Sequence, residues 1–280
     1  MKSCLNAATL ANSLSFLDFV RVAGKAGFAG VEVRLGPLAE MSRDVGVVGV
    51  RTFFAEAGVA PAHCGLSASP IRPDADYQSA IKNVAGECAL AQALGIPTAM
   101  LVMPFRRDQG ESDPRRLVEK VREVSIIAED YGLGITLEFL GLHPPADLRT
   151  PGPTTLGQTL DFIERVDRPN LGVLVDSYHW YLGGSQSADL KRIASGMPLF
   201  VHVNDAPPGP VESLTDPMRV LPGEGILDLR QWLDEIHQAT GYDGYVSLEL
   251  FNEQIRGLDP SVAAERCFHS VDRLLKSLAQ

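Results

Sequence analysis

The fold of this chain is decided by a segment type that occurs four times in its second half, as Ile135-Thr136-Leu137-Glu138, Gly172-Val173-Leu174-Val175-Asp176, Leu199-Phe200-Val201-His202 and Val246-Ser247-Leu248-Glu249. Each segment is an apolar run of β-strand type that stops at a carboxylate or an imidazole. If the runs are parallel strands of one barrel, their last side chains converge at its C-terminal mouth, where barrel enzymes place their chemistry. Three carboxylates and one histidine there would suit a divalent metal such as Mn²⁺, Mg²⁺ or Zn²⁺.

Strand and helix signals alternate along the whole chain, and several amphipathic segments end at a glycine. The expected strands are Cys4–Asn6, Gly30–Arg34, Val59–Cys64, Thr98–Met103, Gly134–Phe139, Leu171–Asp176, Leu199–Val203 and Gly244–Leu250. The expected helices are Ser15–Gly27, Leu38–Ala57, Tyr77–Leu94, Pro114–Tyr131, Thr155–Arg165, Ala188–Ser195, Leu229–Ala239 and Ser261–Leu278. Eight such β/α units predict an α/β protein with the architecture of a (β/α)₈ TIM barrel.

The length of 280 residues suits one barrel of this kind. No linker or low-complexity tract divides the chain, so residues 1–280 are expected to form a single domain. A doubly wound open sheet is the alternative, but no Gly-x-Gly-x-x-Gly motif follows the first strand to support it. The long connections Leu140–Thr154 and Asn204–Gly225 both leave the carboxyl ends of strands, so we expect them to lie over the mouth.

The overall composition excludes some classes of partner. A formal net charge of −10 repels phosphate backbones, which makes nucleic acid a poor partner. No apolar run is as long as a membrane span, and the first residues enter a strand without a signal peptide, so a cytoplasmic protein is expected. The scattered cysteines Cys4, Cys64, Cys88 and Cys267 have no C-x-x-C spacing and are expected to be reduced core thiols. A homo-oligomer stays open.

Each of the four residues that end the strands also has an ordinary explanation when it is taken alone. Asp176 could cap the next segment, His202 could be a satisfied core histidine, and Glu249 could pair with an arginine. Glu138 could be an exposed carboxylate at a strand end. Taken together at four consecutive strand ends, they predict one site for a divalent metal, with Mn, Zn, Mg and Co as the candidate ions.

A metal in this position would bind the ketone oxygen and a neighbouring hydroxyl of a polyol. It would polarise the carbonyl and make the adjacent C–H more acidic, and the metal-bound enediolate that forms would be stabilised by the cation. Glu138 and Glu249 are the expected base and acid that move the proton between the two carbons. The competing interpretation makes both glutamates pure ligands, because contact with a metal lowers the basicity of a carboxylate.

Further candidates surround this site. His179 lies three residues beyond Asp176, in a predicted loop, where it could donate a hydrogen bond to substrate or bind a second metal. Arg219 could hold a substrate oxygen that carries developing charge. Residues at the ends of the first three strands could face the pocket or serve only in rim packing, namely Asn6, Glu32, Arg34 and His63. The remaining histidines, His143, His237 and His269, are expected in loops or on helix surfaces.

Several of these segments resemble a known family. They are Leu5-Asn6-Ala7-Ala8-Thr9, Leu137-Glu138-Phe139, Val173-Leu174-Val175-Asp176-Ser177-Tyr178-His179, Arg219-Val220-Leu221-Pro222-Gly223-Glu224-Gly225-Ile226-Leu227-Asp228-Leu229 and Val246-Ser247-Leu248-Glu249-Leu250-Phe251. The chain resembles the xylose-isomerase-like TIM barrels, a family of sugar isomerases and epimerases that also includes endonuclease IV. Within this family it looks most like the inosose (2-keto-myo-inositol) isomerases, over nearly the whole chain and most strongly after residue 134.

The resemblance implies that the metal ligands are Glu138, Asp176, His202 and Glu249. It also implies proton transfer by the two glutamates and substrate contacts by His179 and Arg219. The expected function is therefore a metal-dependent isomerase of a keto-polyol, with no membrane or nucleic-acid partner. The chain departs from the inosose isomerases around Pro61–Leu66 and Pro104–Gln109, and in a longer loop with His143-Pro144-Pro145.

Related activities would use the same residues and differ in the loops. They are ketose 3-epimerase, hydroxypyruvate isomerase and a dehydroshikimate-type dehydratase. Phosphodiester hydrolysis of the endonuclease IV type needs a multi-metal cluster with extra histidines. The fourth strand, which ends in Met103-Pro104-Phe105, supplies none. A non-catalytic sugar-binding protein is the last alternative, and the set of two glutamates with His179 and Arg219 argues against it.

Overall fold

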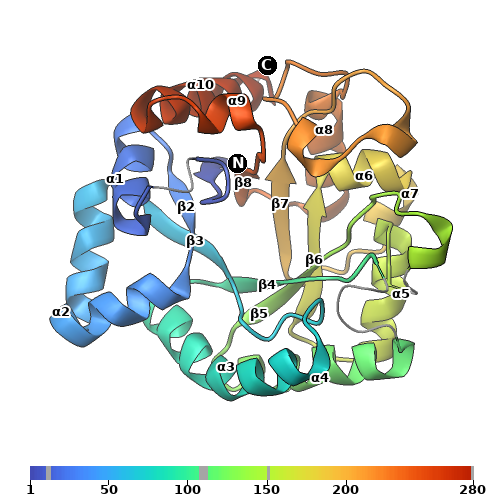
Figure 1. Cartoon of the computed structure of the whole chain (residues 1–280), viewed down its shortest axis with the longest axis horizontal. Helices are drawn as coiled ribbons and strands as arrows, with labels where there is room; N and C mark the ends of the chain where they lie inside the picture. Colours follow the sequence, from blue (N-terminus) through green and yellow to red (C-terminus); the bar gives the residue numbers. More distant parts are fainter. Residues whose placement is uncertain (11–13, 107–112, 150–151, 279–280) are drawn as a thin grey trace.

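The computed structural model describes residues 1–10, 14–106, 113–149 and 152–278. Over these ranges, eight parallel strands close into a barrel in sequential order, and helices surround it (Figure 1). The strands are β1 (Lys2–Leu5), β2 (Gly30–Val33), β3 (Ala60–Gly65), β4 (Thr98–Val102), β5 (Gly134–Glu138), β6 (Leu171–Asp176), β7 (Leu199–Val203) and β8 (Tyr245–Leu248). The predicted TIM barrel is confirmed.

The helices include one long helix after almost every strand. They are α1 (Phe16–Ala26), α2 (Leu35–Ala57), α3 (Asp74–Leu94), α4 (Pro114–Glu129), α5 (Leu156–Val166), α6 (Ser177–Gly183), α7 (Ser187–Leu190), α8 (Leu229–Thr240), α9 (Glu253–Arg256) and α10 (Pro260–Leu278). Three short 3₁₀ turns lie in the long loops, η1 (Ala146–Leu148), η2 (Val211–Ser213) and η3 (Asp216–Met218). None of the helices in the described ranges is long and apolar enough to cross a membrane.

Local signals explain where the helices begin and end. Ser15 caps α1 by accepting a hydrogen bond from the Asp18 amide, and Asp113 caps α4 by accepting one from the Arg115 amide, in front of Pro114 at the first helical position. At the other end of α1, Gly27 has φ of 106°, a left-handed conformation that ends the helix. These caps fix the helix lengths, and the helices then cover the outer face of the barrel.

The strands alternate between an outward apolar face and an inward face. On β6, Val173 and Val175 join the large core between barrel and helices, whereas Leu174 belongs to a separate small cluster with Cys4, Ala62 and Phe200. Because successive side chains of a strand point to opposite faces, this small cluster fills the barrel interior. The next inward position on β6 is Asp176, which places its carboxylate one layer above this apolar filling.

The structure corrects the predicted elements that follow β6. The segment Ser177–Gly183 is the helix α6 and not a loop, because Asp176 caps it directly at the end of the strand. The predicted helix Ala188–Ser195 is wrong in length, since α7 spans only Ser187–Leu190. Beyond it the backbone forms tighter turns, in which Ile193 N donates to Leu190 O at 3.1 Å. Helix α9 was not predicted.

Helix α2 differs from its prediction in two ways. It begins at Leu35, not at Leu38, and it is kinked at Gly46, whose φ of 68° and ψ of 170° are not helical. The positive φ is accessible to glycine without strain, which explains how a helix of this length can change direction around the barrel.

All four cysteines are free and buried, as predicted. Burial raises the pKa of the Cys88 and Cys267 thiols to about 12, so these groups stay protonated near neutral pH. They act as small apolar side chains of the core.

Candidate metal centre

The structure brings the four strand-end residues together at the C-terminal mouth. One donor atom from each of Glu138, Asp176, His202 and Glu249 lies within 4.8 Å of the others, and all four residues are buried. The first three end or nearly end β5, β6 and β7, and Glu249 directly follows β8. Parallel pairing sets this geometry, since Asp176 and His202 are register partners on neighbouring strands. We call these four residues the acidic cluster.

Asp176 uses its two carboxylate oxygens for different purposes. Oδ1 accepts hydrogen bonds from the amides of Tyr178 (2.8 Å) and His179 (3.0 Å) and so caps α6. Oδ2 faces the cluster, 3.9 Å from Nδ1 of His202, and accepts a hydrogen bond from Asn204 Nδ2 at 3.0 Å. Asp176 therefore caps α6 and belongs to the acidic cluster at the same time.

His202 points one ring nitrogen at the three carboxylates. Its Nδ1 lies 3.4 Å from Glu249 Oε2 and 3.5 Å from Glu138 Oε1. Among the described residues, neither Nδ1 of His202 nor Oε1 of Glu138 has an aligned hydrogen bond. Buried polar atoms without partners are costly, and a cation between them removes that cost. The donor set therefore fits one divalent metal held by three carboxylates and one imidazole.

The pKa values at the cluster report the crowding of negative charge. Burial, together with the charges of Glu249 and Asp176, raises the pKa of Glu138 to about 7. Burial works against protonation of His202, but the carboxylates of Glu32 and Glu249 outweigh it and raise the pKa of this imidazole well above its usual value. A centre of this kind stabilises added positive charge, as a metal ligand set must.

Arg219 lies against the cluster and is 1% exposed. Its Nη1 donates to Glu249 Oε2 at 2.8 Å and to Asp176 Oδ2 at 3.3 Å. Its Nε and Nη2 contact Asp216 Oδ1 at 3.2 and 2.6 Å, and the rings of Tyr178 and Phe251 enclose the guanidinium at 5.3 and 5.0 Å. The buried cation offsets part of the carboxylate charge and is held in one orientation.

His179 belongs to the first turns of α6 and not to a loop. Its Nε2 is 2.9 Å from Nη2 of Arg219, so this nitrogen must carry a lone pair for the contact to be a hydrogen bond. Burial and the charge of Arg219 lower the pKa of His179, which favours its neutral form. Its Nδ1 has no hydrogen-bond partner among the described residues. The predicted contact of His179 and Arg219 with substrate stays a prediction.

A cavity of about 400 Å³ opens beside the cluster. Its polar lining comes from Asn6, Glu32, Arg34, Ser67, Glu87 and Glu249. Asn6 Nδ2 donates to Glu32 Oε1 and to Glu249 Oε1, both at 3.0 Å, and so connects this wall to the cluster. We call this cavity the mouth pocket.

His63 is placed differently from the other predicted pocket residues. It is buried, stacks on Phe200 with ring centroids 3.9 Å apart, and does not line the mouth pocket. Its Nε2 lies 3.1 Å from Thr136 Oγ1, and its Nδ1 lies 3.3 Å from Glu32 Oε2. A substrate contact by His63 therefore stays a prediction, while its contact with Glu32 is direct.

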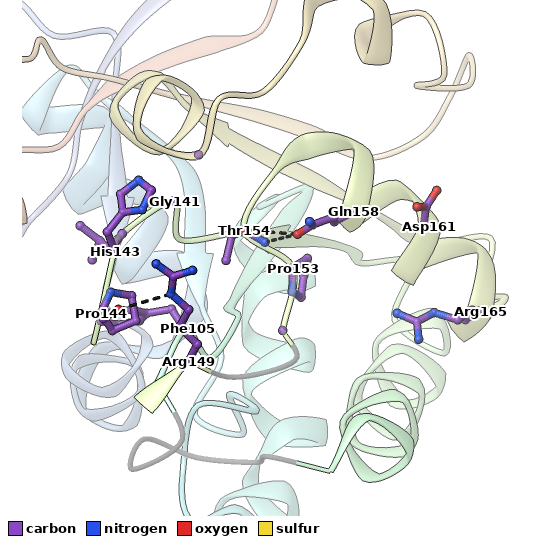
Figure 2. A pocket seen from close by; sticks show the side chains of 13 residues that line it. Phe105, Gly141, His143, Pro144, Arg149, Pro153, Thr154, Gln158, Asp161 and Arg165 are labelled. Carbon is purple, nitrogen blue, oxygen red and sulfur yellow. Dashed lines mark hydrogen bonds between the residues drawn. The ribbon is translucent and has the colours of Figure 1, made fainter. Parts of the chain in front are cut away.

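A second cavity, of about 540 Å³, lies under the loop that follows β5. Figure 2 shows it between the loop residues His143, Pro144 and Arg149 and the α5 residues Gln158 and Asp161. None of the four cluster residues lines it, so the loop Leu140–Thr154 borders a space next to α5 as well as the rim of the barrel. In the segment Pro104–Gln109, where the chain departs from the inosose isomerases, residues 107–109 lie outside the described residues.

Two neighbours of the cluster, Asn204 and Asp216, were not among the predicted site residues. Asn204 follows β7 directly and could have been found from its strand-end position, as His202 was. Asp216 lies in η3, three residues before Arg219, inside a Pro-containing loop. Its pairing with Arg219 is a local i,i+3 contact across this turn, so the spacing of the two residues was a usable signal.

Several known proteins are similar to this chain. The profile of the xylose isomerase-like TIM barrel family matches residues 20–270. Inosose isomerase from Halalkalibacterium halodurans is 31% identical over 258 residues, which cover 91% of this chain and 89% of that protein. 2-Oxo-tetronate isomerase from Haemophilus influenzae is 31% identical over 271 residues, covering 92% and 97% of the two chains.

A solved structure agrees with these matches. A crystal structure of IolI protein with a bound zinc atom superimposes with a TM-score of 0.82 at 27% identity and covers 99% of both chains. The two relatives and the solved structure are each covered over 89% or more of their own length, and the superposition shows the same fold. The chain belongs to the xylose isomerase-like TIM barrel family.

Proposed function

We propose that this protein is a divalent-metal-dependent isomerase of a keto-polyol of the inosose type. The observation that carries the proposal is the buried acidic cluster, in which Glu138 and Glu249 approach one point from β5 and β8 beside the mouth pocket. The names of the inosose isomerase and 2-oxo-tetronate isomerase relatives support this reaction class. The metal ligands in this proposal are Glu138, Asp176, His202 and Glu249.

When bound, the metal supplies Lewis-acid polarisation of the substrate carbonyl, which makes the neighbouring C–H acidic. Zn²⁺, Mn²⁺, Mg²⁺ and Co²⁺ are the candidate ions, and the zinc atom in the related IolI structure supports the first of these.

Two carboxylates are available to move the proton. Glu249 lines the mouth pocket, so it faces the substrate, while Arg219 and Asn6 hold its oxygens in place. Glu138 Oε1 has no hydrogen bond among the described residues, so it is the second carboxylate oxygen available to accept a proton. One glutamate removes the proton from the carbon that carries the hydroxyl, and the other returns a proton to the former carbonyl carbon. The hydroxyl proton passes to the former carbonyl oxygen, so the ketone and the hydroxyl exchange places.

Arg219 and His179 support this transfer from the β6 and β7 side. The guanidinium is fixed between two aromatic rings and already faces Glu249 and Asp176, so it needs little reorganisation to stabilise charge on a substrate oxygen. His179 Nδ1 has no hydrogen-bond partner among the described residues, so it is available to bond a substrate hydroxyl. The aromatic residues and the burial of Arg219 exclude water from this side of the centre.

The lining of the mouth pocket contains groups that could bind a neutral polyol and one arginine that could bind an acid. Carboxylates and amides such as Glu87 and Asn6 accept or donate to hydroxyl groups. Arg34 is exposed at the end of β2 and lines the same pocket, and this position favours a second candidate, an acidic keto substrate whose carboxylate pairs with the guanidinium.

Proton NMR in D₂O tests the proposal. Metal-loaded protein is mixed with 2-keto-myo-inositol, beside metal-free protein and the Glu249→Gln and Glu138→Gln variants. We expect deuterium next to the carbonyl and an isomeric product with the loaded wild type only, and losses of about 10²- to 10⁴-fold for each variant that retains its metal. Glu123→Gln, on α4 and hydrogen-bonded to Tyr77, is the matched control.

Metal content is measured in each variant, because it separates the two roles of a glutamate. A variant that loses the metal has lost a ligand, and one that keeps the metal without exchange has lost the proton carrier. Exchange by the metal-free wild type at the loaded rate would contradict the proposal. Exchange with a ketohexose or with dehydroshikimate, but none with the inosose, would assign the other substrate.

A further inference from the structure

The carboxylate of Glu32 has partners from four different parts of the barrel. Glu32 lies on β2, and its side chain is 5% exposed. Oε1 accepts hydrogen bonds from Asn6 Nδ2 at 3.0 Å and from Ser247 Oγ at 2.5 Å, and lies 2.9 Å from Nε2 of His202. Oε2 lies 3.3 Å from Nδ1 of His63. Glu32 is therefore the centre of a buried polar network next to the acidic cluster.

This network leaves little of Glu32 for a substrate. Oε1 faces three of these protein groups and Oε2 faces His63, so most of the roughly four acceptor positions of an ionised carboxylate lie against the protein. Glu32 borders the mouth pocket and is nevertheless satisfied by the protein itself.

The contact with His202 acts on the nitrogen that faces away from the cluster. Nε2 is 2.9 Å from Glu32, whereas Nδ1 lies 3.4 to 3.9 Å from the carboxylates of Glu249, Glu138 and Asp176. A neutral imidazole has one N–H and one lone pair. If the proton is on Nε2, where a carboxylate faces it, the lone pair of Nδ1 is directed at the cluster. Carboxylates behind metal-binding histidines fix both tautomer and ring orientation.

From this arrangement we propose that Glu32 is a positioning residue of the metal centre, which holds Nε2–H of His202 so that Nδ1 binds the ion. The inference rests on the proposed metal centre. The ring of His202 is not yet aligned for a linear hydrogen bond to Glu32. The 2.9 Å separation of Nε2 and Oε1 is within the range of a hydrogen bond, which a rotation of the ring would align.

Asn6 extends the same support to a second ligand. One amide nitrogen donates to Glu32 Oε1 and to Glu249 Oε1, each at 3.0 Å. Ser247 connects Glu32 to β8 two residues before Glu249. A change at Glu32 is therefore transmitted to His202 directly and to Glu249 through Asn6, and metal affinity is the quantity that reports both.

The first test is metal binding without substrate. Co²⁺ and Zn²⁺ affinities of metal-free wild type and Glu32→Gln are measured by competition with a chromophoric chelator. Because glutamine keeps the shape but not the charge, we expect Glu32→Gln to bind each metal about 10- to 100-fold more weakly. Glu87→Gln is the control for metal affinity, since Glu87 lines the same pocket and accepts from the Ser67 amide rather than contacting His202.

The outcomes separate this inference from the proposed function. Equal affinity of wild type and Glu32→Gln, with a raised KM in the variant, would make Glu32 a substrate-binding residue and overturn the inference while leaving the metal centre intact. Wild type that binds no metal at one equivalent would contradict the proposed function itself, and the inference with it.

A second measurement does not depend on whether the variant folds. In Co²⁺-loaded wild type, Nε2–H of the metal-bound histidine gives a hyperfine-shifted proton signal that disappears in D₂O. We expect this signal to be sharp and to exchange slowly, because the carboxylate of Glu32 holds the proton in a buried place. Rapid exchange, or an imidazole bound through Nε2 instead, would overturn the assignment.

Discussion

The two halves of this barrel do different work. Strands β5 to β8 supply the whole acidic cluster, and Arg219 and His179 come from the segments that follow β7 and β6. Strands β1 to β4 and the residues after them supply most of the wall of the mouth pocket, including Asn6, Arg34 and Ser67. The end of β4, at Val102 and Met103, contributes no donor to the cluster.

This difference indicates which substitutions should abolish activity and which should only change the substrate preference. A metal needs all its ligands at fixed distances, so the second half is intolerant of change at its strand ends. The pocket wall needs only to match the shape and polarity of a substrate, so relatives can vary it without losing the chemistry. Glu32 and Asn6 are exceptions, since they belong to the first half but contact His202 and Glu249, respectively.

The largest effect outside the cluster is expected at Arg219. Arg219→Met removes the cation from Glu249, Asp176 and Asp216. The unbranched methionine side chain still fills part of the space between the two aromatic rings. We expect kcat/KM with the keto-polyol to fall about 10²- to 10³-fold, the usual cost of losing a preorganised charge donor. Steady-state kinetics at saturating metal measures it.

Arg219→Lys sharpens this test. A lysine provides one compact charge that cannot contact both Glu249 and Asp216 as the guanidinium does, so it should recover only a small part of the loss. Metal content and melting temperature are recorded for both variants. If Arg219→Met keeps kcat/KM within about threefold of wild type, the cation has no part in the chemistry, since preorganised donors are worth far more.

Much of this second half could be predicted from the sequence because its signals are local. Each cluster residue ends an apolar run, and parallel pairing puts such ends at one level, as the register of Asp176 and His202 shows. The helix caps at Ser15 and Asp113 are equally local. A barrel with a candidate metal site at its mouth could therefore be predicted from these patterns.

The first half was harder because its contacts depend on register and loop closure. The pairing of β2 with β3 shifts between Val31 and Glu32, where Ala62 of β3 has no register partner, so the direction of the His63 side chain cannot be counted from the start of β3. His63 reads as a strand-end histidine, yet it stacks on Phe200 from β7, which no local pattern reports.

A smaller effect, on stability, is expected at Asp205, which holds that loop. Asp205 is fully buried, and its carboxylate accepts hydrogen bonds from the amides of Ala206, Gly223, Gly225 and Leu227 at 2.8 to 3.1 Å. Its backbone also pairs with Val220, next to Arg219. Asp205→Ala leaves these amides without an acceptor and should lower the free energy of unfolding by about 3 kcal/mol.

Urea unfolding measures this loss, and Glu212→Ala is the control. Glu212 is an exposed residue of η2 in the same loop, so its removal should change the stability by less than about 0.5 kcal/mol. Equal effects of the two substitutions would mean that Asp205 does not hold the loop. A loss of kcat/KM larger than the loss of folded protein would link the loop to the position of Arg219.

The smallest effect is expected in the pocket wall of the first half. Arg34 is exposed at the end of β2 and lines the mouth pocket. For an acidic keto substrate, Arg34→Met should raise KM about tenfold, because one charged hydrogen bond contributes about 1.5 kcal/mol and tenfold corresponds to 1.4 kcal/mol. For a neutral inosose, the same change should leave KM within about twofold.

Arg43→Met provides the control, since Arg43 is an exposed arginine of α2 that does not line the pocket. Both substitutions remove the same charge, so any general electrostatic attraction of an acid should fall equally in the two variants and should weaken in salt. A rise in KM confined to Arg34→Met and to the acid would place the carboxylate beside β2. A loss of kcat or of metal affinity in Arg34→Met would break the division between the halves, because it would show that the pocket wall also sets the chemistry.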